Sequence, residues 1–405
     1  MKPLEGVTVV DLTTFVAAPV CGRLLADMGA RVIKVEAARG DTWRGTGHIH
    51  CPDRYGKDEN PVFDIYNSGK EFISLNLKSP EGMEAMHKLL ETADVFLTNN
   101  RPAALDRLGL GYEQIKEKYP RLIYAIVLGY GEEGPDAQMP AFDTSAFWAR
   151  SGFIRDLAVK GDNYHPVMPP FGMGDTFTGT MLTMQVGTAL YHREKTGKGQ
   201  LVRSGLFHNG IFAVATMVVQ TQRPFGKTFP SRRQDFNVPG GAYPCADGEW
   251  VYFSIGNAAK TIPALHNMLG RPDLTTDPRF LPATRANNRE PYYYILREEF
   301  LKDTADNWAK KAKEFDVPVM KLLHFADVSE DAQAWANGYL ERVEYSTGNV
   351  DVVPTSPVEM ESVGKVVTTP SPKVGQDTRS ILADLGYSDA QIDAMLAAGA
   401  AVENK

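Results

Sequence analysis

Residues 7–36 read VTVVDLTTFVAAPVCGRLLADMGARVIKVE, and this stretch decides the fold. Its β-branched start predicts a strand over residues 7–10. Leucine and methionine recur on one face of residues 19–28, which predicts a helix. Gly29 is expected to end that helix, because a left-handed conformation costs glycine little, and residues 31–35 predict a second strand. A strand, a helix and a strand in this order are the repeating unit of an α/β fold.

The alternation of strand and helix continues beyond this stretch. Further strands are expected over residues 72–77, 95–97 and 122–128. Residues 79–81 read Ser-Pro-Glu, which indicates a helix start with a capping residue, a proline in the first turn and an acid at the positive end of the helix dipole. The series predicts a parallel sheet that is covered by helices on both faces.

The remainder of the chain divides into a long helix, a region of different composition and a helical tail. The helix is expected over about 176–193, and its many small residues suggest close packing against another backbone. Residues 221–288 are richer in proline, glycine and aromatics and contain a hairpin pattern around Asp247-Gly248, which predicts a second, smaller α+β domain. Residues 378–398 are again expected to be helical.

The composition is that of an ordinary soluble protein and argues against several classes. The 405 residues include 43 Lys and Arg and 50 Asp and Glu, and the resulting net charge of −7 disfavours a nucleic-acid partner. The three cysteines form no C-x-x-C pair, which disfavours a disulfide framework and a zinc ribbon. The first residues lack the apolar run of a signal peptide, and the apolar stretches fall short of the ~20 residues that cross a bilayer. We therefore expect a cytoplasmic protein with no membrane partner.

Two segments of the first domain suggest ligands that the surrounding residues do not support. The loop over residues 13–19 follows a strand but lacks the glycines of G-x-G-x-x-G, so a nicotinamide oxidoreductase is disfavoured even though Glu36 resembles a ribose-binding acid. His48, His50 and Cys51 place three possible metal ligands together. Because no further ligands occur at patterned spacing, a solvated loop is favoured and no metal is expected.

Basic side chains and one aspartate are the candidates for chemistry. Several arginines and a lysine follow predicted strands, and together they can hold a phosphate-bearing ligand; they are Arg39, Arg44, Lys70, Arg101 and Arg107. Asp175 lies between glycines just before the long helix, so its carboxylate is sterically open and can act as a covalent nucleophile. Nearby helix amides would help to keep it ionised. The alternative is a plain helix-capping aspartate.

Several segments, taken in order, resemble the family III CoA-transferases, the group of formyl-CoA transferase and carnitine CoA-transferase. The resemblance covers nearly the whole chain. Its blocks are PLEGVTVVDL at 3–12, LLADMGARVIKVE at 24–36, GD at 40–41, NSGKEFISLNLK at 67–78, LGYG at 128–131 with GP at 134–135, GD at 174–175, TGKGQ at 196–200 and GYS at 386–388.

The resemblance implies an architecture and a mechanism. The protein would be an interlaced homodimer with a Rossmann-like, CoA-binding large domain that begins with residues 1–205, a linker over 206–225, a small domain over 226–325, and a linker and C-terminal part over 326–405 that returns to the large domain. The family's catalytic aspartate aligns with Asp175, which would carry CoA as an aspartyl thioester. Acyl-CoA and a carboxylic acid are then the substrates, and no cofactor is bound permanently.

The resemblance also implies positions that contact CoA and the acyl group. The family's CoA contacts fall on Phe15, Val16, Ala17, Asn99, Asn100, Ala104, Arg107 and Leu108, with Arg39 and Lys70 as further candidates. The sequence departs from the family where Val16 replaces a glutamine, Ala37 an arginine and Pro140 a lysine. Gly240 and Gly241 are a partial match to a glycine-rich flap and, with Val16 and Phe142, would line the substrate pocket.

Residues 334–340 (AWANGYL) and 345–349 (YSTGN) resemble the 2-hydroxyacyl-CoA transferases of amino-acid-fermenting anaerobes. Their substrates are enoyl- or 2-hydroxyacyl-CoA and acids such as phenyllactate or 2-hydroxyisocaproate, and a 2-hydroxyacyl-CoA dehydratase would act downstream. An apolar pocket at Phe15, Val16 and Phe142 suits an aryl or branched acyl group. The alternatives are a 2-methylacyl-CoA racemase, which needs a histidine where Phe142 stands, and a non-catalytic subunit that binds CoA thioesters.

Overall fold

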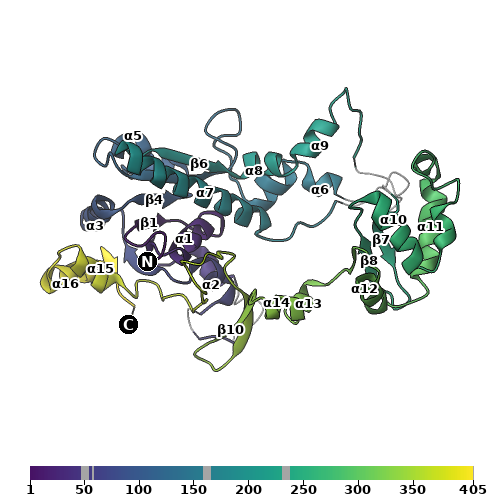
Figure 1. The fold of residues 1–405 in the computed structure, drawn as a ribbon. Coiled ribbons are helices and arrows are strands. Elements are labelled where there is room, and N and C mark those ends of the chain that lie inside the picture. The colour runs from purple at the N-terminus through teal and green to yellow at the C-terminus, as the bar shows by residue number, and fades with distance from the viewer. Residues whose placement is uncertain (47–53, 57–58, 158–165, 230–237, 405) are drawn as a thin grey trace. The chain divides into compact units, whose positions relative to one another are not determined.

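The computed structural model describes residues 1–46, 54–56, 59–157, 166–229 and 238–404 (Figure 1). The chain divides into two compact units. The first unit contains Met1–Phe153, Pro169–Val219 and Asp331–Lys405, and the second contains Ile154–Met168 and Gln220–Glu330. None of the helices in the described ranges is long and apolar enough to cross a membrane.

A seven-stranded sheet in the order β12-β3-β2-β1-β4-β5-β6 forms the centre of the first unit. The six strands in the order β3-β2-β1-β4-β5-β6 pair in parallel with their neighbours, and the short β12 runs antiparallel at the edge beside β3. This arrangement confirms the predicted α/β fold with a mostly parallel sheet. The strands are β1 (Thr8–Leu12), β2 (Arg31–Glu36), β3 (Glu71–Leu75), β4 (Val95–Thr98), β5 (Ile123–Leu128), β6 (Leu201–Gly205) and β12 (Ala401–Val402).

Helices and a separate hairpin complete the first unit. The hairpin pairs β10 (Leu340–Glu344) with β11 (Val350–Pro354). The helices are α1 (Ala17–Asp27), α2 (Pro61–Asn67), α3 (Pro80–Thr92), α4 (Pro102–Arg107), α5 (Tyr112–Ile115), α7 (Met173–Thr196), α8 (Leu206–Ala213), α9 (Ala215–Gln220), α14 (Ala332–Ala336), α15 (Thr378–Asp384) and α16 (Asp389–Ala397), with a 3₁₀ turn over Thr42–Gly45 and a π-helical turn over Asp143–Ala149.

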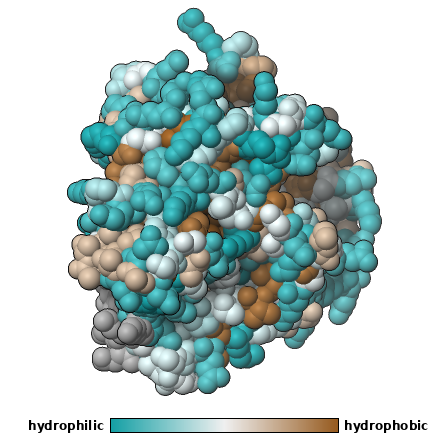
Figure 2. All heavy atoms as spheres, turned by 90° about the vertical axis from the view of Figure 1, so that its left-hand side faces the viewer, coloured by the Kyte–Doolittle hydropathy of each residue, from teal (hydrophilic) through white to brown (hydrophobic). Residues whose placement is uncertain are grey.

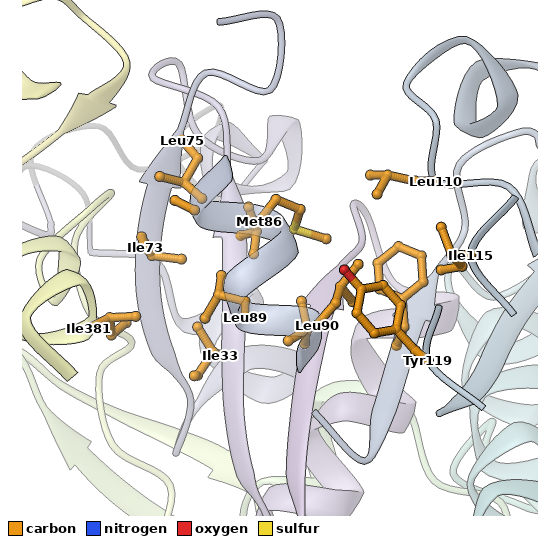
Figure 3. Close-up of a cluster of buried hydrophobic side chains, with 14 of the residues drawn as sticks. Ile33, Ile73, Leu75, Met86, Leu89, Leu90, Leu110, Ile115, Tyr119 and Ile381 are labelled. Atoms are coloured by element: carbon orange, nitrogen blue, oxygen red, sulfur yellow. The ribbon is translucent and has the colours of Figure 1, made fainter. Parts of the chain in front are cut away.

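One face of the sheet is covered by α3 and the C-terminal helices. Ser79 caps α3, because its hydroxyl accepts the Gly82 amide hydrogen at 3.1 Å, as the Ser-Pro-Glu pattern predicts. Met86 and Leu89 of α3 pack on Ile33 and Ile73 of the sheet, and Ile381 of α15 joins the same cluster (Figure 3). Removing a buried leucine such as Leu89 would cost about 2–5 kcal/mol. On the face that Figure 2 shows, the left-hand side of Figure 1, the surface is mostly hydrophilic with small hydrophobic areas between.

The other face of the sheet is covered by α1, which packs closely against α7. Phe72 of β3 packs with Val20 and Leu24 of α1 on this side, while its neighbour Ile73 belongs to the opposite cluster. Gly179 of α7 lies so near α1 that an added Cβ atom would be 2.3 Å from the Ala17 carbonyl oxygen. The prediction that small residues bring this helix against another backbone is confirmed.

The tail returns to the edge of the sheet and forms two helices instead of the single helical stretch predicted. Gly386, at φ +84°, lies between α15 and α16. The Thr378 hydroxyl accepts the Ser74 amide hydrogen of β3 at 3.0 Å, and Asp377 accepts that of Phe72 at 2.8 Å. These contacts join parts of the chain that are about 300 residues apart.

The second unit has its own core around a three-stranded antiparallel sheet. The sheet contains β7 (Gly241–Pro244), β8 (Trp250–Phe253) and β9 (Val319–Lys321), so the hairpin predicted around Asp247-Gly248 is confirmed. The core packs Tyr243 and Phe253 against Tyr292 and Trp308. The helices of this unit are α6 (Phe153–Asp156), at its boundary, α10 (Ala258–Met268), α11 (Arg289–Phe300), α12 (Ala305–Glu314) and α13 (Phe325–Val328).

Candidate active site

A cavity of about 320 Å³ opens at the carboxyl ends of the parallel strands in the first unit. The loops that follow β1, β4, β5 and β6 all contribute to it, which is the usual place for a ligand in an open α/β sheet. Asp175, from the first turn of α7, also lines this cavity. The other lining residues are Thr14, Phe15, Val16, Ala17, Trp43, Asn99, Val127, Leu128, Gly129, Ala141, Phe142, Asp143, Thr144, Phe171 and Leu206.

Asp175 is the third residue of α7, so the alternative interpretation as the capping residue is wrong. The helix begins at Met173, about three residues earlier than predicted, and its cap position is Gly172 with φ +76°. Gly174 has a packing role, because a Cβ atom there would lie 2.3 Å from the Asp143 Oδ1 atom. The glycine before the candidate nucleophile therefore allows a second carboxylate to approach the helix start.

The environment of Asp175 favours its neutral form. Burial and then the charge of Asp143 raise the Asp175 pKa from 3.8 to about 7. The expectation that helix amides keep this carboxylate ionised is therefore wrong. A carboxylate with a pKa near neutrality is still half ionised at pH 7 and is more basic than an exposed one, which favours a nucleophilic role.

Asp143 is a site residue that the sequence interpretation did not select. Its side chain is buried, and its Oδ2 atom accepts the Gly172 amide hydrogen at 3.0 Å. Burial raises the Asp143 pKa, although hydrogen bonds from the backbone at Gly172 and its neighbours oppose that shift. Asp143 thus holds the start of α7 and acts on Asp175. Its position directly after Phe142, which the sequence analysis had selected for the substrate pocket, was the available signal.

Four aromatic rings form one wall of the cavity. Phe15 lies edge-on to Phe142, with ring centroids 5.9 Å apart, and 6.2 Å from Trp43. Trp43 stacks on Phe171 at 5.2 Å and an interplanar angle of 5°. Trp43 is buried, whereas Phe142 and Phe171 are 56% and 69% exposed. The exposed rings offer apolar area to a ligand in the cavity. Trp43 and Phe171 were not predicted from the sequence.

The predicted CoA-contact residues near β1 and β4 lie together. Phe15, Val16, Ala17 and Asn99 line the cavity. Asn99 also supports the loop, because its Oδ1 atom accepts the Thr14 amide hydrogen at 3.0 Å and its Nδ2 atom donates to the Thr14 carbonyl at 2.7 Å.

A second cavity, of about 690 Å³, lies at the carboxyl ends of β1, β2 and β3. Arg39, Asn100 and Leu108 of the predicted CoA contacts line it, together with Lys78. Thr14 lines both cavities, so one extended ligand can reach from one to the other. Arg39 and Lys78 supply the positive charge that phosphate groups require.

Three of the predicted contact positions are placed away from both cavities. Ala104 and the exposed Arg107 belong to α4 and line neither cavity. The Lys70 ammonium is fully buried, 2.8 Å from Asp11, and also donates to the Pro19 carbonyl and to Asn67 at 3.0 Å. The structure therefore uses Lys70 inside the fold and does not bring it to either cavity.

The remaining predicted positions fall in other parts of the chain. Gly240 and Gly241 belong to the second unit, where Gly241 begins β7. Their place in a substrate pocket stays a prediction. The possible metal ligands His48, His50 and Cys51 lie outside the described residues. Within the described ranges, no group of three or more His, Cys, Asp or Glu side chains is arranged to hold a metal ion.

Comparisons with known proteins agree with this geometry. The family described as CoA-transferase family III matches residues 4–378. The chain is 38% identical to (R)-2-hydroxy-4-methylpentanoate CoA-transferase of Clostridioides difficile, over 96% of this chain and 97% of that protein. It is 35% identical to cinnamoyl-CoA:phenyllactate CoA-transferase of Clostridium sporogenes, over 96% and 95%. A crystal structure of Rv3272 from Mycobacterium tuberculosis superposes with a TM-score of 0.81 at 27% identity, over 94% of this chain and 99% of that one. The resemblance found in the sequence is confirmed.

Proposed function

The protein belongs to CoA-transferase family III, and from this membership and the position of Asp175 we propose that it moves CoA from an enoyl- or 2-hydroxyacyl-CoA to a 2-hydroxy acid through a thioester on Asp175. The observation that carries the proposal is that Asp175, a half-buried carboxylate with its pKa raised to about 7, lines a cavity with an aromatic wall. The names of the two relatives at 38% and 35% identity support the substrate class.

The proposed reaction conserves the energy of the donor thioester. The Asp175 carboxylate attacks the thioester carbonyl and the carbon–sulfur bond breaks, so that CoA leaves as a thiolate and a mixed anhydride of Asp175 and the first acid forms. The thiolate then attacks the Asp175 carbonyl carbon and releases the first acid as its carboxylate. The acceptor carboxylate attacks the resulting aspartyl thioester and displaces the thiolate, which forms a second mixed anhydride. The thiolate then attacks the acceptor's acyl carbon, and this forms the new acyl-CoA and frees the Asp175 carboxylate.

The cavity meets two requirements of this sequence. The anhydride and the thioester hydrolyse if water reaches them, and a wall of aromatic rings limits water once an acyl group fills it. The same wall favours an aryl or branched-alkyl acyl group over a small polar acid such as oxalate. We place the acyl group against Phe15 and Phe142, close to Asp175.

We place CoA along the two adjoining cavities. Its thioester end would lie beside Phe15, Val16 and Ala17 at the start of α1, and its phosphates would lie in the second cavity near Arg39. Thr14, which both cavities share, supports this path. Ala104, Arg107 and Leu108 would lie near the adenine end.

The wider setting is part of the same proposal. We expect a cytoplasmic, interlaced homodimer without a permanently bound cofactor. A 2-hydroxyacyl-CoA product suits a downstream 2-hydroxyacyl-CoA dehydratase in amino-acid fermentation. The first two relatives come from Clostridioides difficile and Clostridium sporogenes, which supports this context.

Mass spectrometry after reaction with a CoA thioester tests the formation of the Asp175 thioester. The protein is mixed with cinnamoyl-, isocaprenoyl-, crotonyl- or succinyl-CoA and digested, and the peptide that contains Asp175 is examined for a CoA adduct. We expect the adduct to form with the preferred donor and to disappear, with a new thioester in solution, when a 2-hydroxy acid is added. The Asp175→Ala variant is the matched control. An adduct on that variant, or none with any donor, would contradict the proposal.

A further inference from the structure

One buried carboxylate, that of Asp41, joins the two loops that carry Phe15 and Trp43, two of the four rings of the aromatic wall. Its Oδ1 atom accepts the amide hydrogen of Phe15 at 3.1 Å and that of Trp43 at 3.0 Å. Its Oδ2 atom lies 3.1 Å from the Lys34 ammonium, and both side chains are fully buried. A single side chain thus fixes the backbone under both rings.

The Phe15 backbone requires such a fixed partner. Its φ of +63° is in the left-handed region, which a non-glycine residue adopts at a cost of about 1–3 kcal/mol. The conformation persists only where the surroundings hold it. The Asp41 carboxylate holds the Phe15 amide, and Asn99 holds Thr14 on the other side.

Further buried charges connect Asp41 to the residues at the end of β1. The Lys34 ammonium donates to the Thr13 carbonyl at 2.9 Å, and the Thr13 hydroxyl donates to Asp11. Asp11 is in turn paired with Lys70. On the other side, Glu36 accepts the Asp41 amide hydrogen at 3.2 Å. Thr13 and Phe15, on either side of Thr14, are therefore held by one connected set of buried charges.

We propose that Asp41 is a positioning residue that sets acyl selectivity, because it holds the Phe15 and Trp43 rings at a fixed spacing beside Asp175. The inference rests on the proposed function, since it assigns the control of acyl choice within the same cavity. Asp41 acts through the two backbones and needs no contact with the acyl group.

The test is Asp41→Asn, which keeps the side-chain volume and one acceptor oxygen. It replaces the oxygen beside the Lys34 ammonium with an uncharged NH₂ group, so the ion pair is lost. The Phe15 loop should then relax, and the ring spacing should widen. We expect the ratio of kcat/KM for cinnamoyl-CoA to that for crotonyl-CoA to fall about tenfold, mainly through a higher KM for the aryl thioester. Formation of the Asp175 adduct from crotonyl-CoA should change only a few-fold.

The matched control is Asp94→Asn. Asp94 also accepts a backbone amide hydrogen, that of Thr8 at 2.7 Å, and pairs with Arg193 at 2.8 Å, but it lies at the amino end of β1. It should lower stability without changing the ratio between the two thioesters. An unchanged ratio in Asp41→Asn, or an equal loss for both thioesters, would show that Asp41 is merely structural.

Amide hydrogen exchange on the unaltered protein gives an independent answer if Asp41→Asn does not fold. The Phe15 and Trp43 amides should exchange slowly although they border an open cavity, because both donate to a buried carboxylate. Fast exchange at either amide would overturn the inference. If the unaltered protein forms no Asp175 adduct with any thioester, the proposed function fails, and the exchange result still decides whether Asp41 holds the loops.

Discussion

Two carboxylates near the same end of the sheet, the half-buried Asp175 and the fully buried Asp11, have opposite electrostatic settings. Burial acts to raise the pKa of both. At Asp175 the neighbouring charge is Asp143, and the pKa rises to about 7. At Asp11 the neighbours are Lys70 and Lys34, which lower the pKa below its ordinary value in spite of burial. Burial alone therefore does not distinguish a reactive carboxylate from a structural one; the sign of the nearest charge does.

The two carboxylates also differ in what lies beside them. Burial lowers the Lys70 pKa to about 8, and Lys34 adds to that shift while Asp11 opposes it. The Lys70 ammonium, 2.8 Å from Asp11 and buried with it, therefore has a structural role. Asp175 instead faces a cavity, and its charge is available to a substrate. Four substitutions test whether Asp175 is reactive and the Asp11–Lys70 pair structural, and they follow in order of expected effect.

Replacing Asp175 with alanine should have the largest effect. We expect kcat/KM to fall on the order of 10³-fold or more, because no other group supplies the attacking oxygen. Steady-state assays with the best donor and a 2-hydroxy acid measure the loss. Asp94→Asn serves as the comparison and should stay within a few-fold of the unaltered protein. A residual rate near that of the control would remove Asp175 from the mechanism.

Replacing Lys70 with methionine should mainly affect stability. The change leaves the Asp11 carboxylate buried without its 2.8 Å partner, and we expect the free energy of unfolding to fall by about 3–5 kcal/mol. Urea unfolding measures the loss. Arg31→Met breaks the exposed pairs with Glu71 and Asp384 and should cost less than about 1 kcal/mol. Equal losses in the two variants would mean that burial of the Asp11 pair contributes nothing.

Replacing Asp143 with asparagine should shift the pH profile. In the unaltered protein kcat/KM should fall as the pH drops through about 7, because protonated Asp175 is not a nucleophile. The asparagine can still accept the Gly172 amide hydrogen, but the like charge is gone. Since burial is the larger cause of the raised pKa, we expect the midpoint to move down by about one pH unit. Asp136→Asn, which removes a carboxylate paired with Arg150, should leave the midpoint in place.

Replacing Asp175 with asparagine should remove the activity as the alanine variant does, but its effect on the free energy of unfolding should be small and stabilising. A carboxyl whose pKa is raised on folding contributes stability below its unfolded pKa, and that contribution disappears as the pH rises through about 7. Above that pH the folded protein bears an unfavourable charge that asparagine lacks. We expect a gain of about 1 kcal/mol at pH 8 after allowance for partial exposure, and none at pH 4. Thermal unfolding at the two pH values gives the comparison, and an equal change at both would refute the raised pKa.

The strands and most helices of the first unit could be predicted because their signals are local. Alternating β-branched segments, the Ser79 cap and Gly29, which has φ +103°, each act within a few residues. The start of α7 was predicted too late, because Gly172-Met173-Gly174 carries little helix propensity and begins a helix only where Asp143 holds it. The interruption at Gly386 was likewise hidden within a continuous apolar pattern.

The site could be predicted only in part. Asp175 was a candidate both from its flanking glycines and from a family resemblance, whereas Phe15, Val16 and Ala17 came from the resemblance alone; all four line the cavity. Trp43, Phe171 and Asp143 come from loops after different elements, and only the folded sheet brings them together. Lys70 has the sequence setting of a phosphate ligand, and its pairing with Asp11 spans 59 residues, which no local pattern reveals.

The return of the tail to β3 has a consequence for synthesis. Until residues 401–402 have left the ribosome, the outer edge of β3 lacks the antiparallel neighbour that covers Ala401↔Leu75 and Val402↔Ser74 in the finished fold. An open strand edge invites pairing with another chain. The outer edge of β3 therefore stays open while residues 76–400 are being made, and during that time it can pair with a strand of another chain.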